Sequence, residues 1–243
     1  RALGDEGSVN AKNDGKTALM MACRGGSEGV VGSVLTLKGV DVDAVDGRGR
    51  TALMHAVDQG NGEVVRTLLD AGADANVQDL VGSTALMLAA SDGAAALVAL
   101  LLEHKGIDVN SKDHSGRSAL TYASVDAVAE LVSNSKLDLD VKEPDRGWTK
   151  LMWAAHYGHV DVIDLLEKAD PNVQNNDGYT ALMLATSARR SGSVQRLQRV
   201  FGSRLDATIA VDGNTAVDMA MSSCPAAPAV TAPVVAAPRA QPP

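Results

Sequence analysis

The sequence predicts an all-α solenoid of stacked helix-turn-helix units joined by turn or hairpin fingers. The first observation is a phrase of the form Gly-x-Thr-Ala-Leu-Met, which occurs four times in 243 residues, with three weaker copies. The second is its spacing, with steps of 34, 33, 34, 31, 31 and 35 residues, a period typical of arrays stabilised by stacking. The third is a composition with 45% hydrophobic residues, enough for a continuous core. The equivalent hydroxyl residues are Thr17, Thr51, Thr84, Ser118, Thr149, Thr180 and Thr215.

Each unit reads as helix, turn, helix and finger, as the copy from residue 46 to residue 78 illustrates. Thr51 is a residue type that caps a helix N-terminus, and Gly60 ends the first helix. The second helix carries one apolar stripe, and Gly72 ends it in the manner of a C′ glycine. Gly49 stands where a tight finger turn needs a positive φ. The residues of the stripe are Val64, Val65, Leu68 and Leu69.

We expect one domain over residues 1–221, with about six repeats and a terminal half-repeat. The units start near residues 12, 46, 79, 113, 144, 175 and 210. Residues 222–243 form a Pro/Ala-rich segment that holds six of the eight prolines, and we expect a disordered tail or a semi-rigid linker there. The chain begins with Arg1, and we expect it to be a piece of a longer protein.

Two repeats depart from the pattern. Only 13 residues separate Ser118 from Leu131, where Thr51 and Leu68 are 17 residues apart, so the turn between the helices of that repeat is shortened and lacks its glycine. The repeat that begins at Thr180 has its glycine late, at Gly192. We expect a kink or a soft point at both places.

Charge and cysteine content limit the classes of partner and the cellular compartment that we expect. The formal charge of −8 disfavours nucleic acid and anionic membrane surfaces, and the longest apolar run, residues 94–102, is too short to span a bilayer. Cys23 and Cys224 are too few and too far apart for a disulfide scaffold. We therefore expect a cytoplasmic protein, with the nucleus not excluded.

Four motifs resemble catalytic or metal sites, and each is better explained by the repeat. Residues 15–17 match the end of a P-loop without its first glycine, and residues 47–52 match a dinucleotide turn mostly through repeat positions. Residues 25–29 match a nucleophile elbow but fall in the turn between two helices. His156, His159 and Asp161 lack the further ligands of a metal site. We expect no enzymatic activity, no metal and no cofactor.

The repeat resembles the ankyrin repeat, whose consensus Asp-x-x-Gly-x-Thr-Pro-Leu-His-x-Ala is matched by Asp46, Gly49, Thr51, Leu53 and Ala56. The resemblance covers about residues 8 to 221. Ala replaces the consensus Pro, and the consensus His is replaced by Met at 20, 54, 87, 152 and 183, so we expect more apolar packing there. The resemblance implies a concave surface, built from fingers and first helices, that recognises a protein.

Two positions of the repeat would face that surface: the residue before the cap and the residue four after it. Five of the six aromatic residues lie at or near these positions in three consecutive repeats, and such residues are enriched at binding hot spots. Trp153 and Tyr122 are equally well explained as fillers between first helices, whereas the finger residues Trp148 and Tyr179 favour contact. The predicted partner-binding residues are Trp148, Tyr179, Trp153, Tyr157, Tyr122, Arg50 and Arg117.

A second feature is a run of cations without Asp or Glu from residue 189 to residue 204. It favours a solvated helix face over a site for an acidic partner segment or a phosphate. The cations are Arg189, Arg190, Arg196, Arg199 and Arg204.

The sequence therefore predicts a non-enzymatic protein–protein interaction module, which we expect to be a monomer. One alternative is the regulatory or substrate-recruiting segment of a larger enzyme, such as a kinase or a ubiquitin ligase, with its catalytic domain elsewhere. Another is a structural spacer without a specific ligand on its concave surface.

Overall fold

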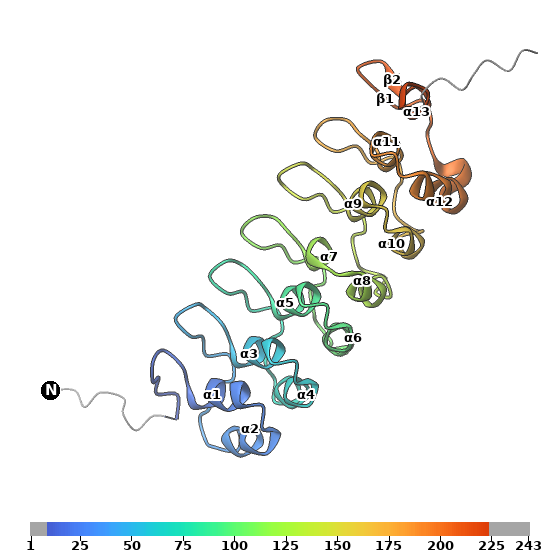
Figure 1. The fold of residues 1–243 in the computed structure, drawn as a ribbon. Helices are drawn as coiled ribbons and strands as arrows, with labels where there is room; N and C mark the ends of the chain where they lie inside the picture. Colours follow the sequence, from blue (N-terminus) through green and yellow to red (C-terminus); the bar gives the residue numbers. More distant parts are fainter. Residues whose placement is uncertain (1–8, 224–243) are drawn as a thin grey trace, which may run out of the picture.

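A computed structural model describes residues 9–223 and shows an elongated array of helix pairs (Figure 1). In each pair the first helix is followed by a second helix on one side of the array, and the fingers project on the other side (Figure 1). The first helices are α1 (Ala18–Gly25), α3 (Ala52–Asp58), α5 (Ala85–Ser91), α7 (Ala119–Tyr122), α9 (Lys150–Tyr157), α11 (Ala181–Ser187) and α13 (Ala216–Ser223). The second helices are α2 (Glu28–Leu35), α4 (Gly62–Asp70), α6 (Ala95–Glu103), α8 (Val125–Leu131), α10 (Val160–Leu165) and α12 (Ser191–Phe201).

The recurring phrase builds the N-terminus of the first helices. The hydroxyl of each cap threonine from Thr17 to Thr180 accepts a hydrogen bond from the amide of the methionine three residues on, as in Thr51 with Met54 at 3.3 Å. These methionines are fully buried, as expected of an apolar substitute for His. The sulfurs of Met20 and Met152 also accept a hydrogen bond from the cap amide at 3.5 Å.

The core is one continuous layer between first and second helices. Val64, Val65 and Leu68 are completely buried on α4, and burial of each such side chain contributes about 1.5–3 kcal/mol. The first helices pack on one another from repeat to repeat except after the shortened α7, which packs on α5, and each second helix contacts the second helix of the next repeat. The expected all-α solenoid is therefore confirmed.

The fingers are mostly tight turns. In the second finger the amide of Asp46 donates to the carbonyl of Arg50, and Gly49 has a φ of +77°. A Cβ at Gly49 would lie 2.8 Å from the amide of Leu80 in the next finger, so only glycine fits this turn. Within residues 9–223 a paired two-stranded hairpin occurs at β1 (Ala210–Val211) and β2 (Asn214–Thr215).

The shortened repeat has the expected defect. Its first helix, α7, has four residues, and α8 is capped by Ser124, only two residues after α7 ends. The deletion thus removes the last turn of the first helix together with the glycine turn.

The repeat that begins at Thr180 keeps its turn at the usual distance from the cap, although its glycine comes late in the sequence. Arg189 has a φ of +56° and occupies the position that Gly60 holds in the second repeat, nine residues after the cap. Gly192 lies inside α12. The turn therefore keeps its place because an arginine adopts the left-handed conformation that glycine adopts elsewhere.

No helix within residues 9–223 is long and apolar enough to cross a membrane. Of the proline-rich segment expected at 222–243, residues 224–243 lie outside the described part of the chain.

Candidate functional site on the finger side of the array

We call the surface formed by the fingers and the exposed sides of the first helices the finger face. Its main aromatic feature lies in the fifth repeat, where the side chains of Trp153 and Tyr157 are 39% and 46% exposed. Their rings lie 4.8 Å apart, as expected for residues four apart on α9, and the ring of His159 stacks on Trp153 at 5.0 Å. We call Trp153, Tyr157 and His159 the aromatic stack.

Trp148 does not point outward from its finger as its position led us to expect. It is only 8% exposed and belongs to the core, with its ring in edge contact with His156 at 5.0 Å. Arg50, which also precedes a cap, turns the same way and pairs with Asp58. In both repeats the residue before the cap folds over its own first helix and meets the residue eight positions on. The interpretation of Trp148 as an exposed contact residue is therefore corrected.

Tyr122 and Tyr179 are half-buried, and within the described residues neither makes a ring contact with the aromatic stack. The hydroxyl of Tyr122 donates a hydrogen bond to Asp113 at 2.5 Å. Burial alone would raise the pKa of Asp113, but hydrogen bonds from Tyr122 and from the amides of Arg117 and Ser115 lower it below its usual value. Tyr122 thus fixes the base of the fourth finger.

The same arrangement occurs in the second repeat, where His55 takes the place of Tyr122. The Nε2 atom of His55 lies 3.0 Å from Oδ2 of Asp46. Burial lowers the pKa of His55 although Asp46 opposes that shift. The residue four positions after the cap therefore hydrogen-bonds to the finger carboxylate in the second and fourth repeats. In the fifth repeat the residue at this position is the exposed Trp153.

Arg50 and Arg117 link neighbouring fingers. Arg50 lies 3.6 Å from Asp79 of the third finger, in addition to its contact with Asp58. Arg117 pairs with Asp145 of the fifth finger at 2.7 Å. Both side chains are partly exposed, so they lie on the finger face, but their charges are already partnered.

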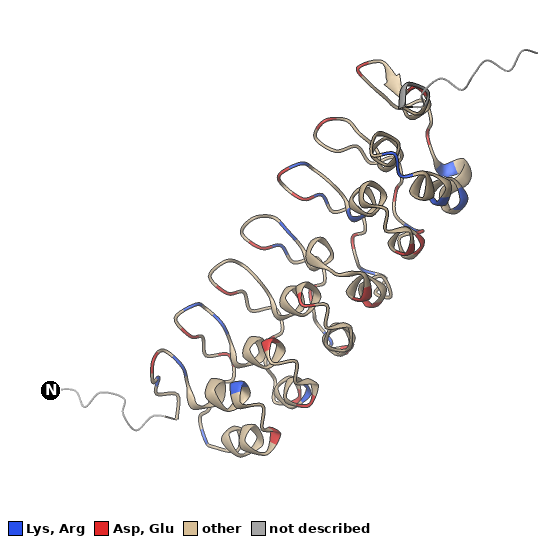
Figure 2. Cartoon of the chain, viewed as in Figure 1, with Lys and Arg blue, Asp and Glu red and all other residues tan. Residues whose placement is uncertain are grey.

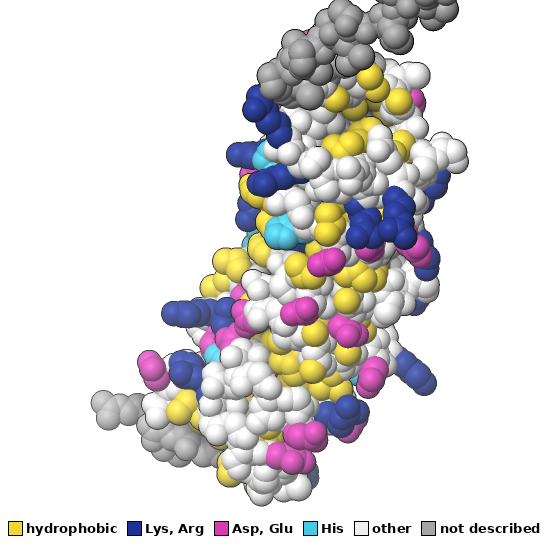
Figure 3. Space-filling view, turned by 45° about the vertical axis from the view of Figure 1, so that its right-hand side comes forward, with side chains coloured by type: hydrophobic (Ala, Val, Ile, Leu, Met, Phe, Trp, Pro, Cys, Tyr) yellow, Lys and Arg dark blue, Asp and Glu magenta, His cyan; other side chains and the backbone are white. Residues whose placement is uncertain are grey.

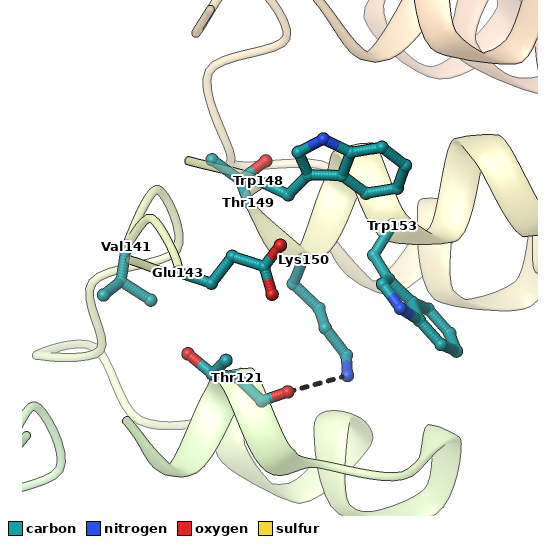
Figure 4. Close-up of a pocket in the computed structure, with 7 residues that line it drawn as sticks. All are labelled: Thr121, Val141, Glu143, Trp148, Thr149, Lys150 and Trp153. Atoms are coloured by element: carbon teal, nitrogen blue, oxygen red, sulfur yellow. Dashed lines mark hydrogen bonds between the residues drawn. The ribbon is translucent and has the colours of Figure 1, made fainter. Parts of the chain in front are cut away.

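A small hollow opens between the fourth and fifth repeats, beside Trp153 (Figure 4). Lys150, the first residue of α9, extends across it and donates hydrogen bonds to the carbonyls of Ala123 at 2.6 Å and Thr121 at 3.5 Å. These carbonyls lie at the C-terminal end of the shortened helix α7, where backbone acceptors lack helical partners. Burial lowers the pKa of Lys150 from 10.5 to about 8.

Two features of this site were not predicted from the sequence. His156 and His159 were interpreted as residues of the repeat rather than as metal ligands, and their ring contacts with the tryptophans were not predicted. The role of Lys150 was also not predicted, although the sequence carried a signal for it. The equivalent residue is Ala in the other six repeats, and the repeat before Lys150 is the shortened one.

Arginines gather at α12 and at the following turn η1 (Gly202–Arg204) (Figure 2). Arg199 is exposed, as expected of a solvated face, whereas Arg190, Arg196 and Arg204 make specific contacts. Arg196 pairs with Asp164 of α10 at 3.0 Å. The Nε of Arg190 donates to the carbonyl of His156, and Arg204 donates to the carbonyls of Glu167 and Ala169. These bonds join the fifth and sixth repeats.

Comparisons with known proteins agree with this architecture. The family described as ankyrin repeats in three copies matches residues 2–79, 71–143, 125–209 and 151–226. Over 61 residues, or 24% of the chain, the sequence is 39% identical to the Inhibitor of Bruton tyrosine kinase of Xenopus laevis, and the match spans 5% of that relative's length.

Two solved structures are similar over most of the chain. The crystal structure of EF0377, an ankyrin repeat protein, has a TM-score of 0.70 at 28% identity and covers 78% of this chain and 99% of its own. The ankyrin repeat domain of Bcl-3, a unique member of the IkappaB protein family, has a TM-score of 0.73 at 25% identity and covers 85% of this chain and 95% of its own.

Proposed function

The chain belongs to the ankyrin repeat family, and we propose that it is a non-enzymatic module that binds a partner protein through the finger face, with the aromatic stack as the main contact. The observation that carries this proposal is the exposure of Trp153 and Tyr157 in a chain with only six aromatic residues. Tyr and Trp bury much area at a low entropic cost, which makes them frequent hot spots.

The arrangement of the aromatic stack supports the proposal. Its rings already contact one another, and Lys150 lies 5.0 Å from the ring of Trp153. Side chains that are held in place before binding lose little freedom when a partner arrives. Of the other predicted contact residues, Tyr157 belongs to the stack, and the buried ring of Trp148 lies 6.5 Å from that of Tyr157. Tyr122 and Arg117 lie in the fourth repeat and Tyr179 in the sixth, on either side of the stack, and Arg50 lies farther along the finger face in the second repeat.

The remaining parts of the proposal rest on charge and chemistry. A net charge of −8 favours a protein partner over nucleic acid or an anionic membrane. Cys23 is a buried free thiol, in keeping with a monomer in a reducing compartment such as the cytoplasm or the nucleus.

The test compares the intact chain with a Trp153→Ala, Tyr157→Ala variant. Met21 provides a matched control, because it stands at the same position of the first repeat as Trp153 and is 53% exposed. Each protein is immobilised, captured lysate proteins are quantified by mass spectrometry, and the affinity of the main partner is then measured by calorimetry. Far-ultraviolet circular dichroism verifies that the variants remain folded.

We expect the double variant to bind the partner at least 30-fold more weakly, and Met21→Ala to bind it as the intact chain does. A loss of about 2 kcal/mol is the lower limit for a hot spot and corresponds to that factor. Equal binding by all three proteins would refute the aromatic stack as the contact, and no specific capture by any of them would favour a structural spacer.

A further inference from the structure

The finger face has another hollow, in the first two repeats, whereas the aromatic stack belongs to the fifth. This hollow has a volume of about 420 Å³ and is lined by the first two fingers and by the helices α1 and α3. Lys and Arg residues gather on these two fingers (Figure 2), and the third finger, residues 73–83, has none. Four basic residues line the hollow, which we call the cationic hollow: Lys16, Arg24, Arg48 and Arg50.

Most of the negative charge in the cationic hollow is partnered, whereas most of its positive charge is not. Asp58 pairs with Arg50. The carboxylate of Asp46 contacts His55 and accepts hydrogen bonds from two amides of its own finger. Asp14 is exposed and has no ion pair within residues 9–223. Three basic residues likewise lack an ion pair within the described part of the chain: Lys16, Arg24 and Arg48.

An exposed apolar pair lies directly beside the cationic hollow, at the tip of the third finger. Leu80 and Val81 are 68% and 62% exposed, more than any other large hydrophobic residue in the described part of the chain. The amide of Leu80 donates a hydrogen bond to the carbonyl of Arg48 at 2.9 Å, so the second and third finger tips are in contact. Because these two side chains lie in solvent, they add little to the core of the array. We call Leu80 and Val81 the apolar tip.

The opposite surface of the array carries the other sign of charge. Every second helix from α2 to α10 contains at least one Asp or Glu, and Arg66 is the only basic residue among them. Asp and Glu side chains lie among exposed hydrophobic side chains on this surface (Figure 3). An acidic ligand would therefore be repelled there and attracted to the cationic hollow.

We propose that the cationic hollow and the apolar tip together bind an acidic segment of a partner protein. Its carboxylates would pair with Lys16, Arg24 and Arg48, and a neighbouring aliphatic side chain would pack on the apolar tip. This proposal rests on the proposed function only in that the finger face binds protein, since it uses none of the residues of the aromatic stack.

A nucleic acid fits the cationic hollow less well than an acidic protein segment. Single-stranded bases are bound by stacking on aromatic rings, and the first Phe, Trp or Tyr of this chain is Tyr122, in the fourth repeat. The net charge of −8 also disfavours a polyphosphate chain.

The probe is a fluorescein-labelled peptide, Glu-Glu-Leu-Leu-Glu-Glu, whose binding to the full chain is followed by fluorescence anisotropy. Two control peptides replace either all Glu by Gln or both Leu by Ser. An exposed ion pair changes affinity by about 1.4-fold to fivefold, so loss of the three pairs should weaken binding of the Gln peptide at least about fivefold. Added salt should reduce that difference, because it screens exposed charges.

Two variants test the two parts of the site, and circular dichroism verifies that both are folded. Arg24→Gln, Arg48→Gln, at two exposed positions, should weaken binding about threefold to tenfold. Its matched control, Lys38→Gln, Lys105→Gln, removes the same charge at exposed positions outside the hollow and should bind as the intact chain does. Leu80→Ser, Val81→Ser should weaken binding of the Leu peptide about tenfold and leave that of the Ser peptide unchanged.

A second measurement needs no variant. The peptide is titrated into the intact chain labelled with ¹⁵N, and the amide signals of Arg24, Arg48 and Leu80 should shift together in the NMR spectrum.

Four results would overturn the proposal. They are no anisotropy change up to about 1 mM protein, equal affinity for the Gln peptide, equal weakening by the matched control variant, and tighter binding of a single-stranded oligothymidylate than of the peptide. The Trp153→Ala, Tyr157→Ala variant should bind the peptide normally, and a loss of binding there would assign the peptide to the aromatic stack. Capture of lysate proteins through the aromatic stack does not depend on the cationic hollow, so either proposal can fail without the other.

Discussion

Replacing Arg189 with Gly should stabilise the protein. Arg189 has a φ of +56° and an exposed side chain, so the substitution relieves backbone strain and removes little packing. A left-handed conformation costs an L-residue about 1–2 kcal/mol, and the greater freedom of glycine in the unfolded chain offsets about 0.4–1 kcal/mol of the gain. The net increase in the free energy of unfolding should be about 0.5–1 kcal/mol, or roughly 1–4 °C in Tm.

Urea denaturation followed by tryptophan fluorescence measures this change. Both tryptophans lie in the fifth repeat, which contacts the sixth, so their emission reports on the region that contains Arg189. The slope of the unfolding free energy against urea should stay constant, because the substitution does not change the surface exposed on unfolding.

Gly60→Ala is the opposite substitution at the equivalent position and serves as the control. Gly60 has a φ of +71° at the equivalent position, and no atom lies within 4 Å of the Cβ that alanine would add. The substitution should therefore introduce strain without a clash and cost about 0.5–1 kcal/mol. If Gly60→Ala lowers the urea midpoint while Arg189→Gly leaves it unchanged or lowers it, the account of Arg189 as a strained residue is wrong.

Three further substitutions test burial in the last repeats. Ser193→Ala should raise the free energy of unfolding in urea titrations by about 1 kcal/mol, because the buried Ser193 hydroxyl has no hydrogen-bond partner within residues 9–223. Ser191→Ala, at an exposed position of the same helix, should leave the free energy of unfolding unchanged. Trp148→Ala should cost about 3 kcal/mol by circular dichroism, and a cost as small as that of Tyr157→Ala would restore Trp148 as a surface residue. Between pH 8 and 10.5 the Lys150 amine binds fewer protons in the folded chain than in the unfolded chain. The free energy of unfolding, measured relative to that of Lys150→Met, should therefore rise with pH across this window by on the order of 1–3 kcal/mol. A difference that does not change with pH would contradict the burial of the amine.

The fold could be predicted from the sequence because every repeat uses the same local chemistry. A hydroxyl cap, a buried methionine three residues after it and a four-residue apolar stripe can each be recognised in the sequence. The period at which they recur predicts that the repeats stack. The late Gly192 was taken as the sign of a kink or soft point in the sixth repeat, because glycine was used as the marker of the left-handed turn residue. The backbone hydrogen bond from Arg189 to Thr186 keeps the turn in place without it.

The candidate site was only partly predictable. Sequence position places Trp148 on a finger, but whether its ring turns outward or over α9 depends on side-chain packing against His156. For Trp153 and Tyr157 the helical spacing was enough, because residues four apart on one helix share a face.

The aromatic stack and the shortened repeat lie next to each other, and the contacts of Lys150 suggest a physical connection. Loss of the last turn of α7 leaves the carbonyls of Thr121 and Ala123 without helical partners, and Lys150 of the next repeat satisfies them. The Lys150 ammonium therefore lies beside the ring of Trp153, 5.0 Å away, where the other repeats have an alanine methyl group. The shortened repeat, which would weaken a regular array, is thus followed by a lysine that is held in place beside an exposed tryptophan. Within residues 9–223 no other repeat has this arrangement.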